Sequence, residues 1–241
     1  MSNRPVSIEN RWDILYRDYP DIYDEFASVP YTPNKIALLH ERFNLTNKII
    51  VDVGSGSGRS SIALAKYAKH VIGVEPEQSM RELAQHNTLK RGLKNIEYVN
   101  GCAERIPLDD DAVDVVIALT AVMYPPEDVI PAFIREARRI RKSRGTVLSI
   151  DVAPGWYGGE LAQVIADPAA ERELQAKHRL FVDESGFAYW DIMQTADYGS
   201  MENMIRTYGF IFGAHVIEYI KQNKMSSMKW KFRVYYETHT R

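Results

Sequence analysis

The sequence predicts an α/β protein built on one doubly wound, mostly parallel β-sheet. Three observations favour this class. Short apolar runs alternate with segments of helical spacing, a glycine-rich turn follows the first run, and polarity alternates residue by residue near the end. A chain of 241 residues can enclose one core with a modest insertion. We therefore expect a single domain.

Five buried strands are predicted first, with helices between them. They cover residues 48–53, 70–75, 96–99, 113–119 and 146–152. Between the last two, apolar residues recur at helical spacing from 129 to 140, and Pro125 and Pro126 suit the first helical turn. The basic residues from Arg138 to Arg144 are interpreted as complements to the dipole at the helix end, rather than as a nucleic-acid patch.

A terminal pair of antiparallel strands is predicted after residue 209. Apolar and polar side chains alternate from Met228 to Tyr236, and the apolar run 211–220 precedes them across a short polar turn, which only a hairpin fits. Together with the five earlier strands, this pair is expected to complete a seven-stranded sheet. The expected organisation is an N-terminal helical lid (1–45), a cofactor-binding core (46–154), a substrate cap inserted after strand five (155–209) and the terminal strand pair (210–241).

Composition indicates a small-molecule partner. The net charge of -2 creates no field that would attract nucleic acid or an anionic membrane. The six histidines and single cysteine show no metal-ligand spacing, so no metal is expected. The N-terminus is too polar for a signal peptide, and no apolar run reaches about 18 residues. We expect a cytoplasmic protein, monomeric or homodimeric.

The glycine-rich turn is the first candidate binding feature. Gly54, Gly56 and Gly58 join the first strand to a helix, where glycine permits positive φ and close approach of a ligand. The second strand ends in Glu75, where an acidic side chain can accept both ribose hydroxyls. The glycine-rich turn and Glu75 together predict a cofactor that contains a nucleoside. The GxGxG spacing, followed by Arg59, differs from the usual dinucleotide fingerprint and weakens a nicotinamide interpretation.

Four successive motifs, VDVGSGSG, VIGVEP, NGCAERIPL and DVVIALTAVMY, resemble those of class I S-adenosylmethionine-dependent methyltransferases. The resemblance covers about residues 48–153 and implies a Rossmann-like fold with S-adenosylmethionine as cofactor. It implies these contacts: Asp52, Gly54, Ser55 and Gly56 at the methionine end, Glu75 at the ribose, Cys102, Ala103 and Glu104 at the adenine, and the Leu119 carbonyl at the ammonium. Cys102 stands where the family often has an acidic residue. Glu104 either replaces that acid as the acceptor for the adenine amino group or is simply an exposed charge.

The resemblance implies in-line methyl transfer to a small-molecule acceptor. Such an enzyme mainly aligns the nucleophile with the methyl carbon, and needs a base only where the acceptor must lose a proton. The catalytic candidates are Tyr124, Asp151 and His178, although hydrogen bonding, capping or a surface position would also account for them. The substrate-binding candidates are Tyr16, Tyr19, Tyr31, Met123 and Tyr124.

Two other functions remain open. One is a noncatalytic cofactor-binding or assembly subunit, and the other is a nicotinamide-dependent oxidoreductase on a related fold. Nucleic-acid substrates are not expected, because Tyr124 stands where enzymes acting on nucleobase amino groups have a polar residue before Pro-Pro.

Overall fold

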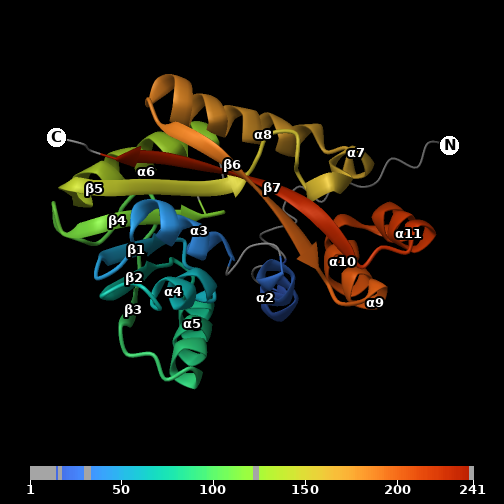
Figure 1. The fold of residues 1–241 in the computed structure, drawn as a ribbon, viewed down its shortest axis with the longest axis horizontal. Helices are drawn as coiled ribbons and strands as arrows, with labels where there is room; N and C mark the ends of the chain where they lie inside the picture. The colour runs from blue at the N-terminus through green and yellow to red at the C-terminus, as the bar shows by residue number, and fades with distance from the viewer. Residues whose placement is uncertain (1–14, 16–17, 30–33, 122–124, 239–241) are drawn as a thin grey trace.

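The computed structural model describes residues 15, 18–29, 34–121 and 125–238, and contains the seven-stranded sheet that the sequence predicts (Figure 1). The strand order is β3-β2-β1-β4-β5-β7-β6. The parallel strands are β1 (Ile49–Val53), β2 (His70–Val74), β3 (Ile96–Val99), β4 (Val113–Leu119) and β5 (Arg141–Val152). Antiparallel β7 (Ser227–Thr238) lies between β5 and β6 (Ala188–Asp197).

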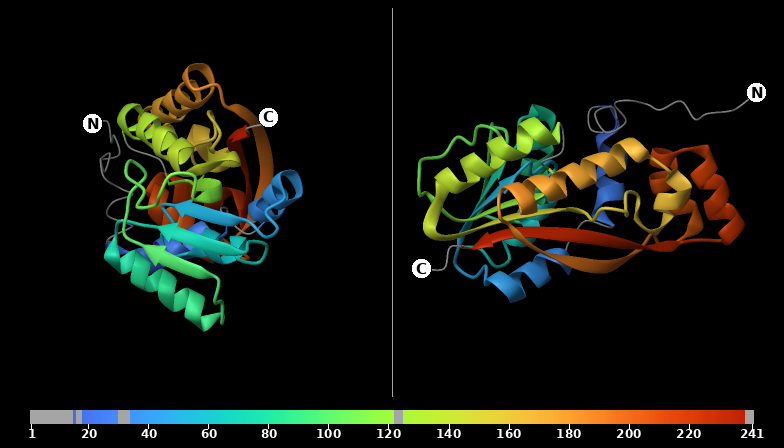
Figure 2. Two further views of the ribbon diagram at one scale, coloured as in Figure 1. Left: turned by 90° about the vertical axis from the view of Figure 1, so that its left-hand side faces the viewer. Right: turned by 90° about the horizontal axis from the view of Figure 1, so that it is seen from above.

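Helices cover both faces of the sheet (Figure 2). Those before and between the parallel strands are α2 (Pro20–Ser28), α3 (Asn34–Phe43), α4 (Arg59–Leu64), α5 (Gln78–Lys90) and α6 (Pro126–Ile140). After β5 come η1 (Gly159–Leu161), α7 (Ala162–Ile165), α8 (Pro168–His178) and the π-helical η2 (Arg179–Glu184). Between β6 and β7 lie α9 (Met201–Met204), η3 (Ile205–Gly209), α10 (Phe210–Phe212) and α11 (Ala214–Asn223). No helix within these described ranges is both long and apolar enough to span a bilayer.

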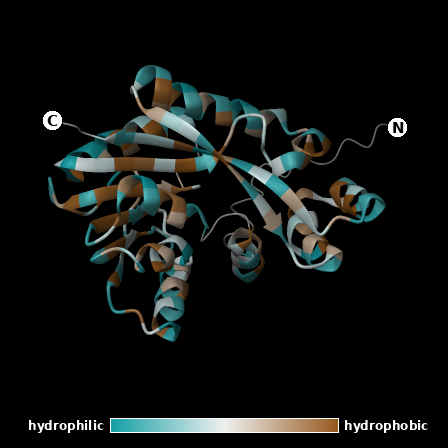
Figure 3. Ribbon diagram, in the orientation of Figure 1, coloured by the Kyte–Doolittle hydropathy of each residue, from teal (hydrophilic) through white to brown (hydrophobic). Residues whose placement is uncertain are grey.

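Two apolar layers enclose the central strands. In β4, Val115 and Ile117 belong to the layer that also holds residues of α3 and α4, whereas Val116 and Ala118 belong to the layer with α6 and η2. Successive side chains of a strand face opposite sides, so a strand buried on both faces is apolar throughout. The hydropathy colouring shows these hydrophobic central strands (Figure 3).

The local sequence specifies where helix α8 begins. The Asp167 side chain accepts hydrogen bonds from the amide nitrogens of Ala169 (3.1 Å) and Ala170 (3.0 Å), and Pro168 occupies the first turn. An acidic N-cap followed by proline satisfies the free amides and fixes φ for the helix. This start places Lys177 and His178 in the last turn, next to the sheet.

The strand predicted over residues 211–220 is wrong. These residues lie in α10 and α11, where Val216 and Ile220 are buried four residues apart, as on one face of a helix. The antiparallel neighbour of β7 is instead β6, from the segment assigned to the cap, with Ala188 paired to Tyr236 and Asp197 to Ser227. The hairpin of adjacent strands is therefore replaced by a helical connection.

The basic segment after α6 also differs from expectation. Only Arg138 and Arg139 lie in the last helical turn, because β5 already begins at Arg141. Arg138 and Arg141 both pair with Glu237, at 2.6 and 3.0 Å. Arg139 pairs with Glu136 at 2.8 Å and with Asp110 at 2.9 Å. Carboxylates of β7, of α6 itself and of the loop before β4, rather than the helix dipole alone, balance these cations.

Candidate cofactor site

The candidate site lies where the strand order changes direction. Strand β1 stands between β2, its neighbour on one side, and β4, which follows later in the chain on the other. Because the strands are parallel, the segments that follow Val53, Val74 and Leu119 meet at one edge of the sheet. In open α/β sheets, ligands bind at this kind of switch point.

The glycine loop is tightly packed at this edge. Gly54, Gly56 and Gly58 have φ values of +69°, +53° and +85°, in the left-handed region. A Cβ atom at Gly54 would lie 2.3 Å from the Cβ atom of Ala121, which follows β4. Glycine is therefore required at position 54 both by backbone conformation and by contact between two loops.

Asp52 presents a buried, partly unsatisfied carboxylate below the loop. Its Oδ2 atom accepts hydrogen bonds from the hydroxyls of Ser60 (2.6 Å) and Ser61 (2.5 Å) in α4. Its buried Oδ1 atom forms no hydrogen bond within the described residues, and neither does the buried Ser55 Oγ. Burial raises the pKa of Asp52 to about 6, while the two serine hydrogen bonds act in the opposite direction.

Glu75 is fixed by two backbone amides just after β2. Its Oε2 atom accepts from the Gly56 nitrogen at 2.9 Å, and its Oε1 atom accepts from the Glu77 nitrogen at 3.0 Å. The side chain is buried. The carboxylate is thus held against the glycine loop, and its contact with a ribose, which the resemblance implies, remains a prediction.

The residues predicted at the adenine form a turn beyond β3. The Cys102 nitrogen donates to the Arg105 carbonyl at 3.4 Å, and the Arg105 nitrogen donates to the Cys102 carbonyl at 3.2 Å. Cys102 and Ala103 are half-buried, whereas Glu104 is exposed. Their place after β3 puts them on the same edge of the sheet as Glu75, and their contact with adenine remains a prediction.

Leu119 closes β4 beside the loop. Thr120 follows with φ of +54°, and its Oγ1 atom donates to the Leu119 carbonyl at 2.7 Å. A carbonyl oxygen has two lone pairs, so this oxygen can accept a second hydrogen bond. The predicted contact with the cofactor's ammonium is compatible with this geometry.

Asp151 and His178 belong to a polar network beneath α8. Asp151 is buried, pairs with Lys177 and accepts from the Val152 nitrogen at 2.8 Å. His178 Nδ1 lies 3.2 Å from Arg233 Nη1, and burial together with the Arg233 charge lowers the pKa of His178. These contacts hold α8 against the sheet, and a catalytic role for either residue remains a prediction.

Most of the predicted substrate residues fall outside the described residues: Tyr16, Tyr31, Met123 and Tyr124. Tyr19 is described. Its exposed ring meets Phe210 edge-on, with 5.7 Å between ring centroids. This contact joins the predicted lid to the helices before β7.

Two residues of the site were missed by the sequence interpretation. The serines that hold Asp52 could have been identified, since SGRSS places Ser60 and Ser61 in the first turn after the loop. Outside the site, the burial of Lys35 in α3 could not be predicted, because a lysine at the start of an amphipathic helix is normally exposed. In the structure it is fully buried.

The sheet order defines an open α/β fold, and the glycine loop, Asp52 and Glu75 lie at its switch point. Residues 50–145 match the family described as "Methyltransferase domain". Within these residues the chain matches a class I, Rossmann-like, S-adenosylmethionine-dependent methyltransferase domain, a class whose cofactor is S-adenosylmethionine.

One curated relative is similar in sequence, and two solved structures share the fold. The uncharacterized methyltransferase YcgJ of Bacillus subtilis is 29% identical over 152 residues, which are 61% of this chain and 55% of that protein. The crystal structure of YcgJ superposes with a TM-score of 0.61 at 18% identity, covering 86% of this chain and 99% of that one. A SAM-dependent methyltransferase structure from Aquifex aeolicus gives 0.56 at 18% identity, with coverages of 94% and 97%. The chain spans about half the length of the curated relatives it matches.

Proposed function

We propose that this protein transfers the methyl group of S-adenosylmethionine to a small-molecule acceptor. The observation that carries the proposal is the buried Asp52 Oδ1 atom, which forms no hydrogen bond among the described residues, below a loop in which a Cβ atom at Gly54 would collide with Ala121. A buried carboxylate oxygen normally has a partner. The ammonium of the cofactor's amino acid end is a suitable donor.

The residues of the edge fit the parts of this cofactor. Asp52 would accept the ammonium, the buried Ser55 hydroxyl has a free hydrogen-bonding capacity among the described residues, and Glu75 offers a fixed carboxylate to the ribose hydroxyls. The cofactor supplies a methyl group that is already activated on a sulfonium. What the protein then contributes is alignment of the acceptor and exclusion of water, and positioning alone supplies about 7 to 11 kcal/mol.

The predicted lid and cap give the acceptor region its proposed walls. Phe26 of α2 packs against Tyr208, Phe212 and Trp230, with ring centroids 6.3 to 6.4 Å apart. One helical turn before Phe26, the ring of Tyr23 has the Arg59 guanidinium 5.6 Å from its centroid. Helix α2 thus connects the glycine loop to the helices between β6 and β7, which supports an acceptor site between them.

Replacing Glu75 by Ala should weaken binding of S-adenosylmethionine and of its demethylated product at least tenfold. Each hydrogen bond to a charged group contributes about 1.5 to 3 kcal/mol. Isothermal titration calorimetry measures the effect. Glu77→Ala is the control, because Glu77 is exposed and contributes only its backbone nitrogen. Equal affinities of wild type and Glu75→Ala would exclude Glu75 as the ribose acceptor.

Binding should also depend on pH through Asp52. The ammonium needs the ionised carboxylate, so affinity should fall about tenfold per pH unit below a pH of about 6. Asp52→Asn, which keeps the shape, should bind weakly and without this dependence. An unchanged slope in Asp52→Asn would assign the titration to another group.

The same raised pKa acts on the stability of the ligand-free protein in the opposite direction. The folded state favours the protonated carboxyl, so this contribution is complete below pH 3.8 and is lost as the pH rises through about 6. It amounts to about 3 kcal/mol at most.

Transfer of tritium from methyl-labelled S-adenosylmethionine to a cell extract tests the activity itself. A noncatalytic cofactor-binding subunit would bind the cofactor and transfer no label. Binding of a nicotinamide cofactor instead would favour the oxidoreductase.

A further inference from the structure

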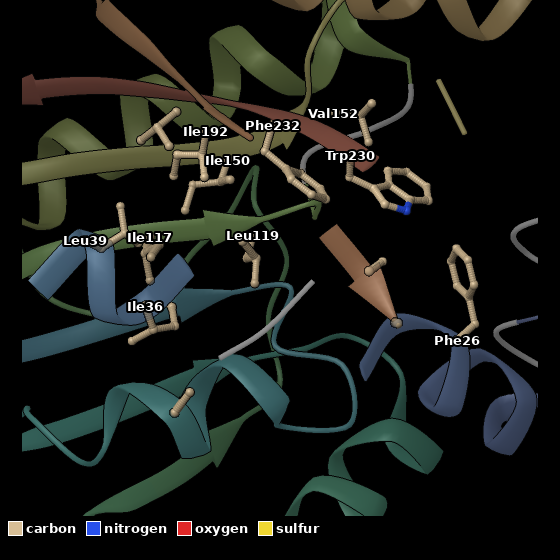
Figure 4. Close-up of a cluster of buried hydrophobic side chains, with 14 of the residues drawn as sticks. Phe26, Ile36, Leu39, Ile117, Leu119, Ile150, Val152, Ile192, Trp230 and Phe232 are labelled. Carbon is tan, nitrogen blue, oxygen red and sulfur yellow. The ribbon is translucent and has the colours of Figure 1, made fainter. Parts of the chain in front are cut away.

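Strands β5 and β7 carry charged residues at paired positions on one of their faces. Ile150, Val152 and Phe232 turn towards an apolar cluster on the other face (Figure 4). Asp151 and Arg233 alternate with these residues along the strands and lie opposite each other in the β5–β7 pairing. A carboxylate and a guanidinium therefore occupy the face of the two strands that meets α8.

The last turn of α8 contacts both of these charged residues. Lys177 pairs with Asp151, and His178 Nδ1 lies 3.2 Å from Arg233 Nη1. Within α8, every residue of which the structure describes, no apolar side chain beyond Leu174 is buried. The two polar contacts therefore attach this turn to the sheet.

The contact between His178 and Arg233 requires a neutral imidazole. A guanidinium has no lone pair and can only donate a hydrogen bond, so Nδ1 of His178 must be the acceptor. The ring proton then lies on Nε2. Protonation of the ring would place an N–H on Nδ1 as well, directed at a donor of the same charge.

Arg233 cannot turn away from a protonated ring without losing other contacts. Its Nε and Nη2 atoms donate to the two carboxylate oxygens of Asp191 at 2.7 and 3.0 Å. Its Cζ atom lies 4.2 Å from the centroid of the Tyr189 ring, which the His178 ring also meets edge-on, with 5.0 Å between ring centroids. A protonated His178 would therefore face a fixed positive charge.

Charged and titratable side chains surround His178 from each neighbouring element. They are Lys177, Arg179, Asp183 and Glu184 of α8 and η2, Asp151 of β5, Asp191 and Tyr189 of β6, Lys231, Arg233 and Tyr235 of β7, and Glu127 of α6. Within the described residues, each of these carboxylates except Asp183 is paired with one of these cations. Burial and the Arg233 charge lower the pKa of His178, while Asp183 and Asp191 act in the opposite direction. At neutral pH the ring is therefore the neutral acceptor that Arg233 requires.

We propose that His178 is a pH switch for α8: the neutral imidazole holds the helix on β7, and the protonated ring releases it. The hinge is η2, because Leu180 and Phe181, directly after the switch, are buried in the apolar layer that also holds residues of α6. Release of α8 uncovers Asp151, one residue before the carboxyl end of β5. Acidification therefore loosens the predicted cap at the edge of the sheet that carries the cofactor site.

Hydrogen–deuterium exchange of the full-length protein between about pH 5 and pH 7.5 tests the switch, with each rate divided by the intrinsic rate at that pH. An isolated helix of 11 residues is marginal in water, so the amides of α8 should exchange fast once the helix is released. Release lets one histidine take up a proton at its ordinary pKa of 6.5. The protection of residues 168–178 should therefore fall by up to about tenfold per pH unit below pH 6.5. Helix α5, whose His86 is exposed, is the internal reference.

Two substitutions at position 178 should fix the switch in opposite states. His178→Asn places Oδ1 at the position of Nδ1, so it accepts from Arg233 at every pH, and the protection of α8 should no longer depend on pH. His178→Lys carries a positive charge throughout, so α8 should be poorly protected already at about pH 7.5. His86→Asn, the same change at an exposed histidine, should behave as wild type.

Protection of α8 that stays constant or rises as the pH falls would overturn the proposal, because Asp183 and Asp191 would then outweigh Arg233. A fall in protection that persists in His178→Asn would also overturn it, by assigning the titration to another group. If His178→Lys does not fold, the comparison of wild type with His178→Asn decides alone. None of these outcomes depends on the methyltransferase assignment, because no cofactor is added.

Discussion

Replacing Asp151 by Asn is expected to destabilise the protein by about 3 to 5 kcal/mol, because it leaves the ammonium of Lys177 buried without its counter-charge. Urea unfolding followed by circular dichroism measures the change. The control is Glu184→Gln, which removes the exposed ion pair with Arg179 and should cost less than about 1 kcal/mol.

The double variant Asp151→Asn, Lys177→Met separates the pair from other effects of the substitution. It removes both charges, so it should recover much of the lost stability. A double variant no more stable than Asp151→Asn would show that the ion pair is not the cause. The folded double variant also tests the catalytic candidate, since loss of a true general base typically lowers the rate about 10² to 10⁴-fold.

Gly54→Ala should destabilise the protein by about 2 to 5 kcal/mol and strongly weaken binding of S-adenosylmethionine. Part of the loss comes from a left-handed residue with a Cβ atom, and the rest from the contact at 2.3 Å with Ala121. Unfolding in urea and calorimetric titration with the cofactor give the two quantities.

Gly92→Ala is a matched control for this substitution. Gly92 has a similar φ of +67°, but no atom lies within 4 Å of a Cβ atom built there, so only the backbone cost of about 1 to 2 kcal/mol should remain. Adding Ala121→Gly to Gly54→Ala should relieve the contact and restore part of the stability. If Gly54→Ala and Gly92→Ala had equal effects, crowding at the loop would contribute nothing.

The parallel strands could be predicted because their signal is local. A strand buried on both faces, such as β4, is a continuous apolar run, and its predicted range 113–119 agrees with the structure at both ends. The predicted range 96–99 of the edge strand β3 agrees as well. The prediction of a strand over residues 211–220 was wrong because a short apolar run is compatible with either a strand or a buried helix. Strand β6 was missed because, at the sheet edge, its inward and outward positions differ little in polarity.

The features of the site also fall into those that local sequence predicts and those that depend on distant residues. The loop from Gly54 to Gly58 and the acid at Glu75 occupy fixed spacings along the chain, so the resemblance could locate them. The environment of Lys35 depends on Gln194, 159 positions away, and the partner of Asp151 lies 26 positions further along. Such contacts arise only once the strands are in order, and no local pattern records them.

The position of β7 has a consequence for how the molecule assembles. A ribosome completes β6 before it makes β7, yet β7 is the strand that joins β6 to the rest of the sheet. Strands β1 to β4 can pair early, whereas β6 cannot join the sheet until β7 has been synthesised. Pairings between residues far apart in the chain also form slowly. Refolding should therefore show an early phase for the cofactor-binding half and a later one in which β7 docks on β5 and β6 joins it.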